Sequence, residues 1–75
     1  MALINRIEKI TRNAHVQKGV YATYNVLIKD GEKYLQINTY GTQDREVKGN
    51  ASQTLQFNKA SAIEMINILT REFEL

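Results

Sequence analysis

The sequence predicts an α+β domain, in which a curved antiparallel sheet of about four strands is followed by one C-terminal amphipathic helix. Three observations predict it: β-prone runs flank Asp30 and Gly31, a short alternating run ends at Phe57, and apolar residues recur at helical spacing after Asn58. A chain of 75 residues has room for a single domain, here residues 1–75. We expect the sheet within residues 20–57 and the helix within 58–75.

The first nineteen residues fit two descriptions. Four apolar residues have the spacing of one helix face: Leu3, Ile7, Ile10 and Ala14. Residues 11–20 can instead enter the sheet as a strand. Of the two, we expect a strand that ends near His15 or Val16.

A β-hairpin is predicted over residues 21–40, because the dipeptide Asp30-Gly31 favours a type I′ turn. With these two residues as the loop, Lys29 faces Glu32 and Thr23 faces Asn38. The alternation then gives one face that we expect to be the core: Tyr24, Val26, Ile28, Leu35, Ile37 and Thr39. The other face is polar and aromatic: Tyr21, Thr23, Asn25, Leu27, Lys29, Tyr34, Gln36, Asn38 and Tyr40.

Residues 41–51 are polar and have no helical period, so we expect a loop, and residues 52–57 form a short strand with Leu55 and Phe57 on one face. Asn58 can cap the helix, and Ser61 with Glu64 offers an alternative capping box one turn later. The stripe expected to lie on the sheet consists of Ala62, Met65, Ile66, Leu69 and Phe73. Ile63 and Ile68 fall outside that stripe, which indicates either a dimer interface or a wide stripe on a small core.

Composition excludes several classes of protein. There is no cysteine, and the single histidine, His15, has no neighbouring carboxylates, so we expect no disulfide, metal or other cofactor. No activated nucleophile or phosphate-binding glycine loop is recognisable, and we expect a protein that is not an enzyme. No long apolar segment or signal peptide is apparent, and we expect a cytoplasmic protein with no membrane partner.

The polar and aromatic face is the candidate binding site. Tyrosine rings can stack on unpaired bases, while amides and cations can reach base edges and phosphates. The predicted nucleic-acid-binding residues are Lys18, Tyr21, Lys29, Lys33, Tyr34, Gln36, Asn38, Tyr40, Arg45 and Lys48. The other interpretation is that tyrosines on a strand surface serve β propensity and cross-strand pairing alone.

The segment from Tyr34 to Gly41, the pair Lys48-Gly49, and the run from Leu55 to Asn58 that leads into the helix resemble the positive-cofactor-four family. These are single-stranded-DNA-binding transcriptional coactivator domains. The resemblance covers roughly residues 20–73. It implies a ββββα fold, a homodimer packed through the helices, and single-stranded DNA held on curved sheets without sequence preference. It also implies contacts from six residues: Lys33, Tyr34, Gln36, Asn38, Tyr40 and Lys48.

Two functions therefore compete. The first is a homodimeric, sequence-tolerant protein that binds single-stranded DNA or RNA as an accessory to transcription, replication or repair. The second is a small protein–protein interaction module or regulator, of phage or bacterial type, that captures a protein partner through its sheet edge or helix face without binding nucleic acid.

Overall fold

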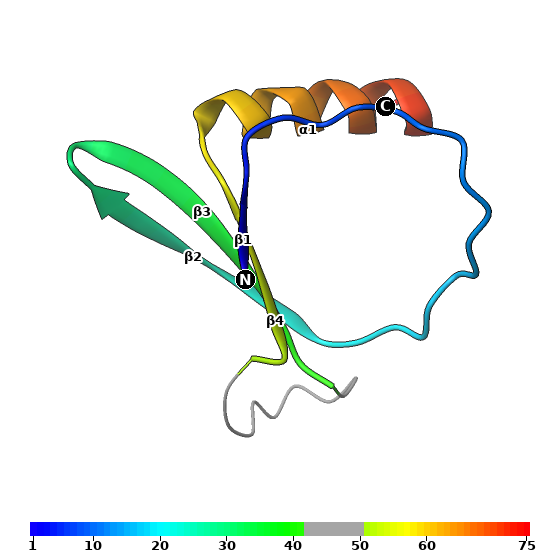
Figure 1. Ribbon diagram of the computed structural model, residues 1–75, viewed down its shortest axis with the longest axis horizontal. Helices are drawn as coiled ribbons and strands as arrows, with labels where there is room; N and C mark the ends of the chain where they lie inside the picture. Colours follow the sequence, from blue (N-terminus) through cyan, green and yellow to red (C-terminus); the bar gives the residue numbers. More distant parts are fainter. Residues whose placement is uncertain (42–50) are drawn as a thin grey trace.

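The computed structural model describes residues 1–41 and 51–75, which form a four-stranded, mostly antiparallel open sheet and one C-terminal helix (Figure 1). The elements are β1 (Ala2–Ile4), β2 (Ala22–Lys29), β3 (Glu32–Thr39), β4 (Gln53–Phe57) and α1 (Lys59–Phe73). Their order in the sheet is β1-β4-β3-β2. The predicted α+β class is confirmed. The pairing of β1 with β4 is parallel, which the sequence did not indicate.

The hairpin of β2 and β3 has the register that the turn residues predict. Asp30 and Gly31 have φ angles of 53° and 78°, the positive values that a type I′ turn requires at both central positions. Lys29 pairs with Glu32, and the pairing continues to Ala22 and Thr39. Strand β4 then pairs with β3, so that the hairpin is flanked on one side and open on the other.

Helix α1 begins with a capping box. The backbone N–H of Ser61 donates to Asn58 Oδ1 at 2.9 Å, and the backbone N–H of Asn58 donates to Ser61 Oγ at 3.1 Å. Asn58 is therefore the N-cap, as predicted, and the alternative start one turn later is not used. Ser61 is fully buried, so this side of the helix is turned toward the rest of the chain.

The N-terminal prediction was wrong. The strand is residues 2–4, and residues 5–20 contain neither the strand expected to end near His15 or Val16 nor a helix. The reason is that Ala2–Ile4 already occupies the edge of β4, with Leu3 opposite Gln56. The chain then leaves the sheet: Asn5 Oδ1 accepts from Nδ2 of the N-cap Asn58 at 3.2 Å, and Ile7 is the first residue that donates to the helix.

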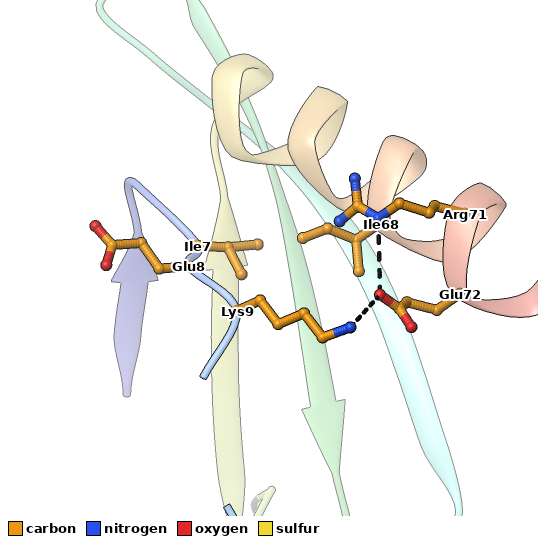
Figure 2. Close-up of a pocket in the computed structure, with 6 residues that line it drawn as sticks. All are labelled: Ile7, Glu8, Lys9, Ile68, Arg71 and Glu72. Carbon is orange, nitrogen blue, oxygen red and sulfur yellow. Dashed lines mark hydrogen bonds and ion pairs between the residues drawn. The ribbon is translucent and has the colours of Figure 1, made fainter. Parts of the chain in front are cut away.

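The segment around Ile7 and Lys9 runs along α1 (Figure 1). The backbone N–H of Ile7 donates to Glu64 Oε2 at 2.9 Å, and Lys9 Nζ lies 3.2 Å from Glu72 Oε2. Figure 2 shows Ile7 and Ile68 pointing toward one another across a hollow of about 240 Å³. The neighbouring Lys9 ammonium lowers the pKa of the Glu72 carboxyl. Because this ion pair is exposed, it contributes little to stability.

The predicted apolar stripe of α1 does not lie on the sheet along its whole length. Ala62 and Met65 are half-buried, and Ala62 lines a hollow with Val26 and Phe57, but the later residues of the stripe are exposed, contrary to prediction. Ile66 and Phe73 are 62% and 69% exposed, whereas Ile68, which was expected outside the stripe, is half-buried beside Ile7. Ile63 is exposed. The capping box and the N-terminal segment hold the side of the helix that carries Ser61 and Ile68 against the chain, so the later residues of the stripe are turned away.

The sheet face predicted to be the core is exposed on β2 but half-buried on β3, where Leu35, Ile37 and Thr39 lie. Tyr24 and Ile28 are 71% and 73% exposed, and Val26 and Leu55 are exposed as well. Among the residues that the structure describes, Phe57 is the one buried hydrophobic residue, at 7%. The helix leads away from β4 and leaves this face uncovered within the chain (Figure 1).

Replacing the N-cap tests the role assigned to the capping box. We expect Asn58→Ala to lower the free energy of unfolding by about 1 kcal/mol, because Ser61 N–H loses its acceptor. For a domain of this size the melting temperature should fall by roughly 4–8 °C. The matched control is Asn67→Ala, an exposed position in the same helix, where a change within about 0.5 kcal/mol is expected. Equal loss in both variants, measured by urea denaturation at one protein concentration, would contradict this role.

Candidate nucleic-acid interface

The polar face of the sheet is built from matched positions on neighbouring strands. Asn38 lies opposite Thr23 on β2 and Thr54 on β4. Two residues along β3, Gln36 lies opposite Asn25 and Gln56. Because side chains alternate between faces along each strand, these polar residues all project from the same side. The face that sequence alternation predicted is thus extended by β4.

A chain of side-chain hydrogen bonds crosses this face. Gln56 Nε2 donates to Gln36 Oε1 at 2.8 Å, and Gln36 Nε2 donates to Asn38 Oδ1 at 2.7 Å. Asn38 Nδ2 in turn donates to Asn25 Oδ1 at 2.9 Å and to Thr23 Oγ1 at 3.1 Å. We call these five residues the amide network. It links β4, β3 and β2, and it fixes which end of each linked amide is the donor.

The amide network changes what the predicted site can do. Gln36 and Asn38 were expected to reach base edges, but both donate to neighbouring side chains, and Asn38 is buried. A ligand on this face would meet an ordered, hydrogen-bonded surface rather than free amides. Such a surface favours stacking over the reading of particular bases.

Tyrosines lie at both ends of the amide network. Tyr21 and Tyr40 have ring centroids 6.0 Å apart with an interplanar angle of 34°, and the Tyr40 hydroxyl lies 3.2 Å from Thr23 Oγ1. Tyr34 lies opposite Leu27 toward the hairpin turn. Six residues of extended chain separate Tyr34 from Tyr40, a span of about 20 Å. All three rings are half-buried, so part of each remains open to solvent.

The predicted cations are not brought together. Lys29 is exposed on the polar face beside the turn, and Lys18 is exposed in the N-terminal segment. Lys33, also a predicted nucleic-acid contact, pairs with Ile28 and therefore belongs to the opposite, apolar face rather than to the face of the three tyrosines. Arg45 and Lys48 lie outside the described residues. Lys29 is thus the one predicted lysine of the described strands on this face.

Sequence reasoning missed the part that β4 and β1 contribute. Gln56 donates into the amide network, and Leu3 lies opposite it on β1. Alternation within residues 52–57 placed Gln56 with Thr54 on one face, but no local signal specified which strand would pair with β4. In the described part of the chain, Thr54 Oγ1 is the buried side-chain group that lacks a hydrogen-bond partner.

Other kinds of site have no counterpart in the described part of the chain. Within residues 1–41 and 51–75, no group of three or more His, Cys, Asp or Glu residues is placed to hold a metal ion. None of the helical segments within residues 1–41 and 51–75 is long and apolar enough to cross a membrane. The one histidine, His15, is exposed in the N-terminal segment.

Breaking the amide network at its centre should destabilise the fold. Asn38→Ala removes the acceptor of Gln36 Nε2 at a buried position, so we expect the free energy of unfolding to fall by about 1–3 kcal/mol. The same change at the exposed Asn13 should alter it by less than about 0.5 kcal/mol. Urea titrations followed by circular dichroism compare the two. An effect of Asn38→Ala no larger than that of Asn13→Ala would show that the network does not stabilise the sheet.

Comparisons with protein-family models, with curated proteins and with solved structures gave no match to this chain. The resemblance to the positive-cofactor-four family thus has no further support from relatives. The sheet itself offers two different surfaces, an ordered polar and aromatic one on one side and an exposed apolar one on the other.

Proposed function

We propose that the protein is a sequence-tolerant, single-stranded nucleic-acid-binding protein that acts as a homodimer in the cytoplasm. The observation that carries this proposal is the difference between the two faces of the sheet. On one face the amides hydrogen-bond to one another in the amide network, and the tyrosines are partly open to solvent. The other exposes large apolar side chains, including Tyr24 and Ile28. Each face therefore needs a different kind of partner.

The apolar surface supports a second copy of the chain as the first partner. Tyr24, Val26 and Ile28 of the sheet are exposed, as are Ile66, Leu69 and Phe73 of α1. A standard interface buries roughly 800 Å² on each partner. The start of α1 adjoins the apolar face of the sheet, because Ala62 lines the same hollow as Val26 and Phe57. A second copy would cover both.

The polar face would then remain outward and serve as the platform for a strand. Tyr34 at one end and the Tyr21–Tyr40 pair at the other offer surfaces on which bases can stack. With Gln36 and Asn38 engaged in the amide network, little on the face distinguishes one base from another. Lys29 would contact phosphate, and a symmetric dimer would double the number of such cations. Such a platform would bind a strand without sequence preference.

We propose binding rather than catalysis. The residues of the platform are amides, hydroxyls and phenols, and the exposed His15 lies in the N-terminal segment rather than among them. A nucleophile needs a base within hydrogen-bond reach, and no described hydrogen bond of this face joins such a pair. The lack of cysteine throughout the sequence fits a reducing compartment such as the cytoplasm.

One observation favours the alternative, a protein–protein interaction module. Ile66, Leu69 and Phe73 are exposed on α1 at the i, i+3, i+7 spacing that helices use to enter a hydrophobic groove. The same three residues would serve a homodimer or a different protein partner. The mass of the isolated protein separates the two, because a protein awaiting another partner would be monomeric.

Strand binding tests the proposed platform. We expect a labelled strand of about 20 nucleotides to bind more tightly than the matching duplex, and Tyr34→Ala with Tyr40→Ala to weaken binding at least about tenfold through lost stacking. Raising the salt from about 50 to about 200 mM should weaken binding modestly, since few phosphates are contacted. Fluorescence anisotropy measures each of these affinities.

The control for strand binding is Tyr24→Ala, the same substitution on the opposite face of the sheet. We expect an affinity within about twofold of the unmodified protein, measured at a concentration at which light scattering gives both proteins the same mass. No binding at micromolar protein, or equal affinity for strand and duplex, would contradict the proposed function.

Light scattering tests the homodimer. The unmodified protein should have a mass of about 17 kDa, twice the 8.6 kDa of one chain. Ile66→Asp should give a single chain, because it places a charge in the apolar surface that a second copy would cover. The neighbouring Asn67→Asp adds the same charge outside the stripe and should leave the dimer intact. A monomeric unmodified protein would favour the interaction module.

A further inference from the structure

A hollow of about 330 Å³ opens on the polar face, lined by Leu3, Leu27, Lys29, Tyr34 and Gln56. Its position follows from the register of the sheet. Gln56 lies between Leu3 on β1 and Gln36 on β3. Two residues earlier on β3, Tyr34 lies opposite Leu27 of β2, but it has no strand partner on the side of β4, because β4 ends at Phe57. Asn58 caps the helix at this point, and the missing strand residue leaves the hollow.

The lining combines flat apolar walls with a fixed polar edge. Tyr34 contributes an aromatic ring, and Leu3 and Leu27 contribute aliphatic side chains from the strands on either side. Gln56 is held in one orientation, because its Nε2 donates to Gln36 Oε1 at 2.8 Å. Within the described residues its Oε1 accepts no hydrogen bond. Lys29 adds an ammonium group at the side of the hollow that faces the turn.

This combination matches the chemistry of a nucleobase. The two faces of a base are apolar and stack on aromatic or aliphatic side chains, whereas its edge carries hydrogen-bond donors and acceptors. The volume is at the lower end of the roughly 300–1,000 Å³ typical of pockets for small organic ligands. By contrast, the hollow beside Ile7 and Ile68 is bounded by the N-terminal segment and the helix and has no aromatic wall.

We infer that this hollow is a pocket for a single nucleobase of the bound strand, an inference that rests on the proposed single-strand binding. Tyr34 stacks on the base and Leu3 and Leu27 enclose it. Gln56 contacts its edge through Oε1, positioned by the amide network. Lys29 contacts the adjoining phosphate. Since one amide can pair with the donor edge of several bases, the pocket orders the strand without selecting a sequence.

Ligand mapping by nuclear magnetic resonance tests this pocket on the full, unmodified chain. Deoxythymidine 5′-monophosphate should shift the backbone amide signals of Leu3, Leu27, Tyr34 and Gln56. Deoxyribose 5-phosphate is the matched ligand that lacks the base, and it should leave the backbone amide signals of Leu3 and Gln56 unchanged. Strand binding by the same sample is measured in parallel by anisotropy.

The variant Gln56→Leu should weaken binding of the mononucleotide about fivefold. Gln53→Leu, the same change on the opposite face of the same strand, should leave it within about twofold. If the strand binds but the mononucleotide shifts none of the four signals, or if both ligands shift them equally, the base pocket is wrong and the proposed function stands. If the strand does not bind at all, both are wrong.

Discussion

The capping box between Asn58 and Ser61 is the interaction on which the rest of this structure depends. It begins α1 directly after β4 and buries Ser61, so the helix turns that side toward its own chain. The hydrogen bond from Ile7 to Glu64 holds the N-terminal segment on the helix. Ile66 and Phe73 are left exposed as a result, and so is the apolar face of the hairpin. A single chain thus links the amides of the polar face to one another and leaves large apolar side chains of β2 and α1 exposed.

The two faces of the sheet differ in how far their side chains already have partners within the chain. On the polar face, four amides and a threonine hydroxyl accept or donate to one another across three strands, and such networks are most stabilising when every member is paired. On the apolar face, burial against a partner would contribute roughly 25 cal/mol for each Å² removed from water. This contrast is why we propose a second copy for one face and a nucleic-acid strand for the other.

Local signals in the sequence predicted the local structure well. The turn residues Asp30 and Gly31 gave the register of the hairpin, and Asn58 gave the start of the helix, because each acts on its immediate neighbours. What could not be predicted depends on long-range placement. A cap marks where a helix begins but not how it lies on the sheet, so the exposure of Ile66 and the contact of Ile68 with the N-terminal segment were missed. Likewise, the pairing of Leu3 with Gln56 joins segments from opposite ends of the chain, and without it the hollow could not be located. The full amide network depends on the pairing of Gln56 with Gln36, which is also long-range.

Fluorine nuclear magnetic resonance of the four tyrosines tests most directly whether the two faces of the sheet bind different partners. Tyr21, Tyr34 and Tyr40 belong to the polar side, and Tyr24 belongs to the apolar side. The chain would be labelled with 3-fluorotyrosine and its signals assigned with Tyr→Phe variants. Our account predicts that a single strand shifts the three polar-side signals and leaves Tyr24 unchanged, while dilution to monomer shifts Tyr24 alone. A strand that shifts Tyr24, or dilution that shifts Tyr34 and Tyr40 instead, would contradict it.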